Sequence, residues 1–409
     1  MSERYRCRFC DRELDDVILD LGLSPLSNAL VRPEDVDEPE TFLPLRVQRC
    51  DGCGLVQLPE YASAAAIFSD YAYFSSFSST WVAHGRALAH DLVAREKLDG
   101  SSLVVELASN DGCLLEHFAR AGVRVHGVEP AANVARAAVD RGIPTTVEFF
   151  GAALARRLCA ELGRADVVVA NNVLAHVPAL NDFVAGIRVL LAERGVATIE
   201  FPHLLRTVEH GEFDTFYHEH FSYFSLTVAE KVLAAHALRV AGVEELSTHG
   251  GSLRLSVRHG KNEEPVRSVE AIKALERAAQ LDAHEGFVPL ARSARRTKRD
   301  LLELFIGAER GGKRVAGYGA PAKATTLLNY CGIRTDLLGF TVDKSPRKQG
   351  RFIPGVRIPI EAPQRLTEVK PDLVLILPWN IADEIVEEMA VVRSWGGRFV
   401  VPIPELQER

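Results

Sequence analysis

The sequence predicts an α/β protein of three parts: an N-terminal zinc-binding domain with four cysteine ligands, a central Rossmann-like domain and a second Rossmann-like α/β domain at the C-terminus. Two Cys-x-x-Cys pairs predict the first part. Two stretches in which short apolar runs alternate with helical patterns predict the others, because strands spaced by helices form parallel doubly wound sheets. A chain of 409 residues accommodates two or three domains of roughly 100–200 residues each. We expect the domains to span residues 1–70, 71–260 and 261–409.

Composition and charge describe an ordinary globular protein. Hydrophobic residues make up 47% and charged residues 25%, and the formal net charge is −7. That mild acidity argues against a general nucleic-acid binder, which usually presents a basic surface. The sequence has no run of roughly 18 apolar residues to cross a membrane, and its first residues lack the apolar stretch of a signal peptide. We therefore expect a cytoplasmic protein, a monomer or weak oligomer, without nucleic-acid or membrane partners.

The cysteines near the start predict a metal site. Seven cysteines, an odd number without an export signal, favour metal binding or burial over disulfides. Cys7 and Cys10 form one pair, and Cys50 and Cys53 form the second. Four thiolates from two such hairpins surround Zn²⁺ tetrahedrally and leave no open position, so the zinc would be structural. The pairs are far apart, so a loop must bulge between them, and scattered prolines indicate that residues 1–70 are irregular. Four unrelated cysteines are the alternative.

The first alternating stretch carries a candidate cofactor site. Its apolar runs lie at residues 103–107, 123–128, 166–170 and 195–200. The first run leads into a turn of small residues and a helix start, where the backbone and its free N–H groups can approach a ligand. About 20 residues further on, Glu129 ends the second run, and such an acid can hold both hydroxyls of a ribose.

Two cofactor classes fit this pattern: a dinucleotide and S-adenosylmethionine. The turn lacks the Gly-x-Gly-x-x-Gly spacing of dinucleotide folds. It also carries Glu106 and Asp111, which suit a sulfonium and its amino group but repel a pyrophosphate. A structural glycine turn is the alternative. We expect S-adenosylmethionine to contact this turn and the next two strand ends, at Glu106, Ala108, Asn110, Asp111, Gly112, Glu129, Pro130, Asn171 and Asn172.

Residues 211–225 gather aromatic rings around three titratable groups, His218, Glu219 and His220. A metal cluster is one interpretation, but alternating side chains would direct the histidines to one side and the carboxylate to the other. General base chemistry fits better, because histidine has a suitable pKa and a carboxylate can orient it. His176 follows the third strand, at the edge where ligands bind such sheets. A surface loop with incidental histidines is the alternative.

The second alternating stretch follows a charged, helical segment at residues 262–310. Its first apolar run leads into a glycine turn and a helix start, which suits a phosphate cradle with Lys323 as a cation. Asp343 ends the next run and precedes several cations. A nicotinamide dinucleotide also fits, because Asp343 lies about 20 residues after the glycines; a solvated loop is a further alternative. The candidate substrate ligands are Tyr318, Lys323, Asp343, Lys344 and Lys348.

Taken together, these motifs resemble the S-adenosylmethionine-dependent sugar C-methyltransferases that make branched deoxysugars, chiefly the 3-C-methyltransferases of dTDP-4-keto sugars. The resemblance covers essentially the whole chain and rests on both cysteine pairs and on residues 106–112, 171–176, 217–220 and 317–323. One departure is Ala108, where we expect glycine. The resemblance implies a structural zinc, a C-terminal domain that grips the dTDP-sugar, and His220 as the general base. It also implies that other side chains line the same pocket, namely Tyr71, His176, Tyr217 and Glu219.

The residues also suit the chemistry of such a reaction. A carbon beside a ketone loses its proton only if the resulting enolate is stabilised, so the enzyme needs a base and donors for the oxyanion. Two rival functions remain: an NAD(P)H-dependent sugar ketoreductase, alone or combined with methylation, and a zinc-knot binding protein with a degenerate methyltransferase core. The sequence leaves open whether C3 or C5 is methylated and which sugar is used.

Overall fold

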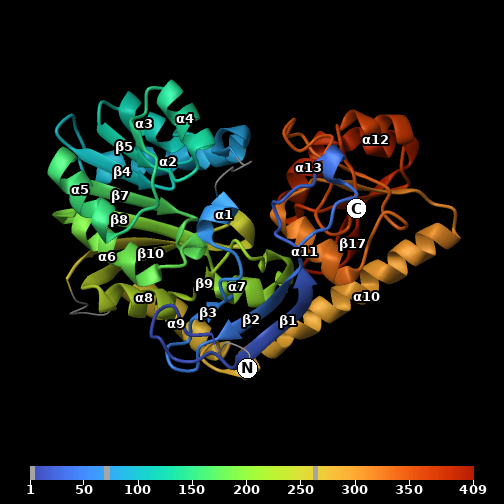
Figure 1. The fold of residues 1–409 in the computed structure, drawn as a ribbon, viewed down its shortest axis with the longest axis horizontal. Coiled ribbons are helices and arrows are strands. Elements are labelled where there is room, and N and C mark those ends of the chain that lie inside the picture. The colour runs from blue at the N-terminus through green and yellow to red at the C-terminus, as the bar shows by residue number, and fades with distance from the viewer. Residues whose placement is uncertain (1–4, 69–73, 261–265) are drawn as a thin grey trace.

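The structure, a computed structural model, describes residues 5–68, 74–260 and 266–409. It contains three sheets. Figure 1 shows two lobes side by side, with the seven-stranded sheet in one and the six-stranded sheet in the other. Strands β1 and β2 lie beneath the gap between the lobes, and the long helix α10 runs along the base of the C-terminal lobe. The predicted three-part α/β architecture is confirmed.

The N-terminal sheet has four antiparallel strands, in the order β1-β2-β3-β9. Its strands are β1 (Asp16–Ser24), β2 (Leu43–Arg49), β3 (Val56–Gln57) and β9 (Ser222–Tyr223). The two long strands correct the expectation that residues 1–70 are irregular. The last strand comes from the histidine-containing segment, because Val56 pairs with Tyr223 and Gln57 with Ser222.

The central sheet has the order β10-β11-β8-β7-β4-β5-β6. Its parallel strands are β4 (Leu103–Leu107), β5 (Arg124–Val128), β6 (Thr145–Thr146), β7 (Ala165–Asn171) and β8 (Leu191–Pro202). A hairpin of β10 (Leu238–Leu246) and β11 (Ser252–His259) adds antiparallel strands beside β8. Every residue of β4 is buried, as expected for the middle of a sheet covered on both faces.

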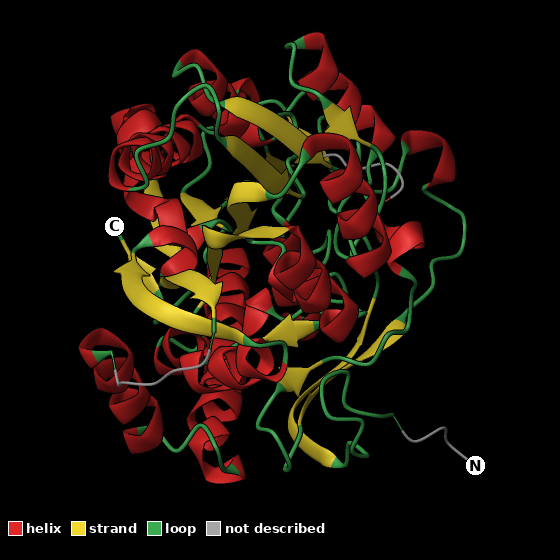
Figure 2. Cartoon of the chain, turned by 90° about the vertical axis from the view of Figure 1, so that its left-hand side faces the viewer, coloured by secondary structure: helices red, strands yellow, loops and turns green. Residues whose placement is uncertain are grey.

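Helices surround the strands of this lobe, and Figure 2 shows the chain's helices in red around its strands in yellow. The central helices are α1 (Ala64–Phe68), α2 (Ser79–Arg95), α3 (Cys113–Arg120), α4 (Ala132–Asp140), α5 (Ala152–Leu162), α6 (Leu180–Leu190), α7 (Leu204–Glu209), α8 (Leu226–Ala235) and α9 (Arg267–Ala278). Val269 and Ile272 of α9 join the apolar core of the central sheet. The predicted helical arm is therefore divided, and its first helix packs with the central lobe.

The C-terminal sheet has the order β14-β13-β12-β15-β16-β17 and is parallel except for its last strand. Its strands are β12 (Val315–Tyr318), β13 (Thr341–Val342), β14 (Ile360–Glu361), β15 (Leu373–Ile376), β16 (Arg398–Val401) and β17 (Gln407–Glu408). Its helices are α10 (Val288–Arg310), α11 (Ala322–Cys331), α12 (Gln364–Val369) and α13 (Ala382–Glu388). At about 1.5 Å per residue, α10 extends roughly 35 Å.

The N-terminal residues join the lobes through two apolar cores. One core combines Cys50 and Leu55 with Phe201 of the central sheet. The other combines Val47 of β2 with Phe305 of α10 and residues of the C-terminal sheet. Burying apolar surface against both lobes holds the lobes in a fixed arrangement. Within the described residues, no helix is long and apolar enough to cross a membrane.

Candidate active site

The four predicted cysteine ligands come together. Their sulfur atoms all lie within 4.8 Å of one another, with Cys7 3.6 Å from Cys53 and Cys10 3.5 Å from Cys50. A zinc ion with bonds of about 2.3 Å to four sulfurs separates them by about 3.8 Å, so the cluster fits Zn²⁺. Gln57 Nε2 lies 3.2 Å from the Cys7 sulfur and can donate to it. Across the described part of the chain, these cysteines are the one group spaced for a metal ion.

The cysteine cluster is docked onto the central lobe. Asn181 of α6 donates to the carbonyl of Phe9 at 2.9 Å. Lys231 of α8 donates to the carbonyl of Cys53 at 3.0 Å. A zinc ion there would hold together the hairpins that carry these contacts. With four sulfur ligands it would have no open coordination position, so its role would be structural.

The turn after β4 has the backbone conformation that a close-lying ligand requires. Ala108, Asn110 and Gly112 have φ angles of 54°, 50° and 75°. Left-handed backbone costs a residue with a side chain about 1–2 kcal/mol, which explains why glycine was expected at position 108. Alanine is the smallest side chain that replaces it, so the backbone remains open to approach.

Glu129 closes the turn from the neighbouring strand. Its Oε2 accepts from the backbone N–H of Asn110 at 3.0 Å, and its Oε1 accepts from that of Ala131 at 2.8 Å, across Pro130. Burial raises the pKa of Glu129, and these two N–H groups partly offset the rise. Each carboxylate oxygen keeps a second lone pair, so the group can also hold a ribose hydroxyl.

Several buried oxygen atoms around the turn have no hydrogen-bond partner within the described ranges. They are Glu106 Oε2, Asp111 Oδ1, Asn171 Oδ1 and Asn172 Oδ1. Glu106 and Asn171 line a pocket together with Trp81, Val82, Gly85, Cys113 and Leu114. Burial, with Asp111 and Glu129 nearby, raises the pKa of Glu106 well above its ordinary value. Unpaired buried acceptors beside a pocket call for a ligand with positive charge, and the amino and sulfonium groups of S-adenosylmethionine fit.

A hydrogen bond to the backbone fixes the tautomer of His220. Its Nδ1 is 3.1 Å from the carbonyl of Thr215, in the turn η4 (Phe213–Thr215). A carbonyl only accepts, so Nδ1 carries the hydrogen and Nε2 keeps its lone pair. His176, in the turn η3 (Leu174–His176), is held in the same way, with Nδ1 2.9 Å from the carbonyl of Glu219.

Aromatic neighbours surround this histidine. The His220 ring lies 4.7 Å from that of His176 and 4.1 Å from that of Tyr217. Burial, followed by His176, lowers the pKa of His220 well below its ordinary value. Burial also lowers the pKa of His176 to about 4. Both imidazoles are therefore neutral near pH 7, the form in which a histidine accepts a proton.

The structure corrects one expectation about this segment. The Glu219 carboxylate does not orient His220: it accepts from the backbone N–H and side-chain amide of Asn28, at 3.1 and 2.6 Å. His218 also turns away and donates to the carbonyl of Pro44 at 3.1 Å. The reason is β9, which pairs the segment with the N-terminal sheet, so the carbonyl of Thr215 orients His220 instead. Tyr71, a further predicted residue, lies outside the described residues.

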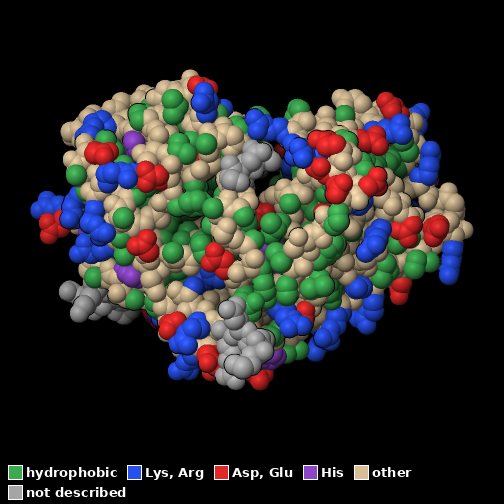
Figure 3. All heavy atoms as spheres, in the orientation of Figure 1, with side chains coloured by type: hydrophobic (Ala, Val, Ile, Leu, Met, Phe, Trp, Pro, Cys, Tyr) green, Lys and Arg blue, Asp and Glu red, His purple; other side chains and the backbone are tan. Residues whose placement is uncertain are grey.

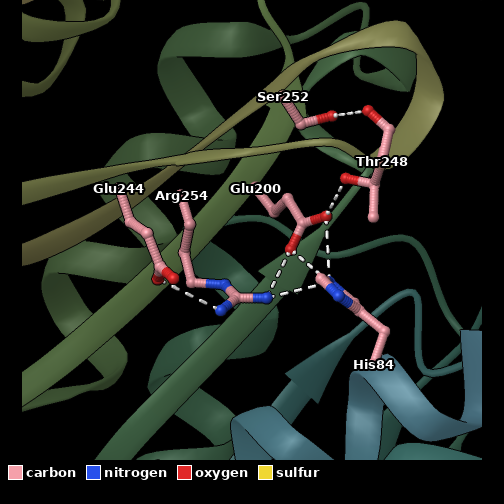
Figure 4. Close-up of polar contacts among 6 residues, drawn as sticks. All are labelled: His84, Glu200, Glu244, Thr248, Ser252 and Arg254. Carbon is pink, nitrogen blue, oxygen red and sulfur yellow. Dashed lines mark hydrogen bonds and ion pairs between the residues drawn. The ribbon is translucent and has the colours of Figure 1, made fainter.

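The structure adds a polar network that sequence reasoning missed, shown in Figure 4. Glu200, at the end of β8, accepts from His84 at 2.9 Å, Arg254 at 3.0 Å and Thr248 at 3.1 Å. Burial alone would raise the pKa of Glu200, but His84 and Arg254 bring it below its ordinary value. Trp81 stacks on His84 at 5.1 Å, so the network fixes helix α2 and the tryptophan that lines the cofactor pocket.

The predicted substrate residues of the C-terminal lobe are partly engaged by the protein. Asp343 accepts from the backbone N–H groups of Ala320 and Ser345, both at 2.8 Å. Lys348 lies 3.4 Å from Asp343, and Lys344 pairs with Glu388. These three are therefore less free to meet a diphosphate than the sequence indicates.

Tyr318 and Lys323 remain available to a ligand. The Tyr318 hydroxyl is buried and has no partner within the described ranges. Lys323 Nζ donates to Asn380 at 2.9 Å and lies 4.1 Å from the Trp379 ring centre.

The two lobes face each other across the candidate site. Figure 3 shows the surface hollowed between them. Arg347 of the C-terminal lobe lies 4.2 Å from the ring centre of Phe74, and Thr80 donates to Glu384 at 3.1 Å. These contacts join the two lobes directly.

Comparison with known proteins assigns each part of the chain. Family models match residues 7–68 ("Putative zinc binding domain"), 82–241 ("Methyltransferase domain") and 247–404 ("C-methyltransferase C-terminal domain"). The C-methyltransferase NovU of Streptomyces niveus is 36% identical over 400 residues, covering 98% of this chain and 95% of that protein.

Solved structures also match the chain. Magnesium protoporphyrin IX methyltransferase from Synechocystis PCC 6803 with bound SAM is 18% identical; the match covers 49% of this chain and 100% of that one, with a TM-score of 0.36. The PH0226 protein from Pyrococcus horikoshii OT3 is 19% identical; its match covers 50% and 100%, with a TM-score of 0.38.

Proposed function

This chain belongs to the S-adenosylmethionine-dependent C-methyltransferases, and from that premise we propose that it methylates C3 of a dTDP-linked 4-keto-deoxysugar through an enolate formed by His220. Its methyl donor is S-adenosylmethionine, and its N-terminal domain binds zinc. The observation that carries the proposal is a neutral histidine, with Nδ1–H held by a carbonyl and Nε2 left to accept a proton, packed against His176 just after the end of strand β7.

The proposed reaction begins with proton transfer to this histidine. His220 Nε2 takes the proton from C3, and the electron pair of the C–H bond forms the enolate with C4 and its oxygen. The Thr215 carbonyl holds Nδ1–H, fixing the tautomer and stabilising the imidazolium that forms. Tyr217 and His176 pack around the ring and restrict its motion.

S-adenosylmethionine supplies an electrophilic methyl group when bound. Glu106 and Asp111 would hold its amino group, Glu129 would hold its ribose, and Asn110, Asn171 and Asn172 would border it. Held there, the donor would lie at the strand ends, where His176 follows β7 and packs against His220. Because the donor is already activated, correct positioning of the enolate carbon supplies much of the acceleration.

The C-terminal lobe would bind the nucleotide part of the sugar. Its glycine turn precedes α11, whose first N–H groups suit an anion, and the unpartnered hydroxyl of Tyr318 borders the same strand end. We also propose a cytoplasmic location, because none of the seven cysteines is in a disulfide and four of them form the metal cluster, a state maintained in a reducing compartment.

Mass spectrometry with a panel of dTDP-4-keto-deoxysugars tests the proposal. With S-adenosylmethionine, we expect a mass gain of one methylene on the sugar and a new carbon–carbon bond at C3 by NMR. Methylation at C5, oxygen or nitrogen would refute the proposed position. Consumption of NADPH without a methyl donor would instead identify a ketoreductase, and failure to bind S-adenosylhomocysteine would indicate a degenerate core.

His220→Asn tests the base separately. We expect it to bind S-adenosylhomocysteine normally but to lose exchange of the substrate C3 proton in deuterated water. Normal exchange and methylation in this variant would assign the base to another group.

A further inference from the structure

An enolate is stabilised by a cation or by aimed hydrogen-bond donors beside its oxygen, and the histidines around the base supply no cation. His220 and His176 are both neutral. Burial likewise lowers the pKa of His249, in the turn η5 (Thr248–Gly250), to about 4. Neutral groups alone stabilise an oxyanion less than a preorganised cation or a set of aimed donors does.

Lys323 is a cation held close to the segment that carries the base. Its helix α11 binds that segment directly, since Thr326 donates to the carbonyl of Phe216 at 3.0 Å. The ring on which Lys323 rests belongs to Trp379, whose Nε1 donates to Asp214 at 2.8 Å. Asp214 precedes Thr215, the residue whose carbonyl holds His220. Lys323 is therefore two contacts away from the backbone that orients the base.

The ammonium group of Lys323 keeps hydrogen-bond donors for a ligand. The structure records no ion pair for it among the described residues, and Asn380 Oδ1 is its hydrogen-bond acceptor there. An ammonium has three N–H donors, so two remain for a ligand. Burial lowers the pKa of Lys323, while Asp214 and Glu212 partly offset this. A partly buried cation without a paired carboxylate is costly to maintain and is typical of functional sites.

We propose that Lys323 is a catalytic residue that donates to the C4 oxygen of the keto sugar and stabilises the enolate, with Trp379 and Asn380 fixing its position. This inference rests on the proposed function and deepens it. As His220 takes the C3 proton, the C–H electron pair moves into the C3–C4 bond and the carbonyl pair moves onto oxygen, beside the ammonium. When C3 takes the methyl group, the S–CH₃ electron pair stays on sulfur and the ketone re-forms. Lys323 neither gains nor loses a proton overall.

Phosphate binding, the role expected from the sequence, predicts different behaviour for the same lysine. A phosphate ligand stabilises the bound substrate and the transition state equally, so its loss raises KM with little change at saturation. An enolate stabiliser acts only as charge develops, so its loss lowers the rate at saturation. The split between KM and maximal rate therefore decides between the roles.

Exchange of the C3 proton measures enolate formation without methyl transfer. The wild type, Lys323→Met, Lys323→Gln and Lys323→Arg are each incubated with dTDP-4-keto-6-deoxyglucose and S-adenosylhomocysteine in deuterated water. Both neutral variants should lose about 100-fold or more in exchange at saturating sugar, the usual effect of removing one oxyanion donor. Arg should recover part of the rate, because it keeps the charge in a different geometry. Calorimetry with dTDP should show nearly unchanged affinity in all four proteins.

Lys298 provides a matched control. It also donates to an oxygen, the carbonyl of Tyr330 at 2.7 Å, and lies 5.0 Å from an aromatic ring centre, but on α10. Lys298→Met should exchange at the wild-type rate. Two outcomes would overturn the inference and leave the proposed function standing. One is exchange at the wild-type rate in both neutral Lys323 variants. The other is loss of dTDP affinity with a normal exchange rate at saturating sugar. Absence of exchange in the wild type would overturn the proposed function together with it.

Discussion

Replacing Glu106 by Gln should make the ligand-free protein more stable and bind its cofactor more weakly. Glu106 Oε2 is buried and unpartnered within the described residues, and burial raises the pKa of this carboxyl well above its ordinary value. A buried polar group without a partner costs about 1–3 kcal/mol, and more when charged. Glutamine keeps the shape and one unpaired polar atom but removes the charge, so we expect a gain of about 1 kcal/mol. At roughly 2–4 °C per kcal/mol for a domain of this size, the thermal midpoint should rise by a few degrees.

The same substitution removes a charged acceptor from the cofactor. Loss of a charge-assisted hydrogen bond costs about 1.5–3 kcal/mol, so affinity for S-adenosylhomocysteine should fall by about 10- to 100-fold. Differential scanning calorimetry without ligand and titration calorimetry with S-adenosylhomocysteine measure the two effects. A lower midpoint together with unchanged affinity would refute the assignment of Glu106 to the cofactor pocket.

The pH dependence of stability gives an independent check on the same carboxyl. In the unfolded chain the pKa of Glu106 is about 4.3, whereas in the folded protein burial raises it. Between these two values the folded state binds more protons, so this group's contribution to stability falls as pH rises. Glu106→Gln should lack that slope, and the difference in midpoint between the two proteins should grow from pH 4 towards neutrality. A constant difference would contradict the raised pKa.

Three further outcomes follow from the structure. Elemental analysis should find one zinc per chain. Cys50→Ser should lose the metal and lower the thermal midpoint, because the cluster shares a core with the central sheet. A metal-free wild type of full stability would contradict this. Glu200→Gln should destabilise the protein by about 3 kcal/mol, because it leaves the mostly buried charge of Arg254 without its buried partner. The control Glu244→Gln removes an exposed partner of the same arginine and should change stability by less than about 0.5 kcal/mol. Equal effects would show that the network does not fix α2. The rate of C3 proton exchange should stay constant from pH 8 down past the usual histidine pKa of about 6.5, because burial lowers the pKa of His220. A loss of half the rate at about pH 6.5 would place its pKa at the ordinary value.

Much of the fold and the cofactor turn is predictable because the patterns involved are local. Cys-x-x-Cys spacing implies a hairpin that brings both sulfurs to one side, so the four ligands can be assigned without a structure. The ends of β4, β5 and β7 follow from apolar runs, and the carboxyl ends of parallel strands meet at one edge of the sheet. Glu106, Glu129 and Asn171 therefore lie towards the same edge of the sheet.

The remaining features depend on contacts between distant segments. The direction of the Glu219 side chain is set by Asn28 and by the pairing of β9 with β3, and neither contact leaves a mark in the local sequence. The network of His84, Glu200 and Arg254 joins a helix to two strands, and each residue alone resembles a solvated surface charge. Strand β11 alternates buried and half-buried residues, a pattern typical of antiparallel strands, so the hairpin of β10 and β11 does leave a signal in the sequence.

The β3–β9 pairing has a consequence for how the protein is made. The strand that completes the N-terminal sheet emerges from the ribosome only after most of the central domain has been synthesised. Until then β3 has an unpaired edge, which is a site for wrong pairing with another chain. Contacts so distant in sequence form slowly, since a long loop must close before they are made. The histidine segment should therefore be among the last parts to gain protection in a pulsed hydrogen-exchange experiment on the refolding protein, after the cysteine hairpins have bound their metal.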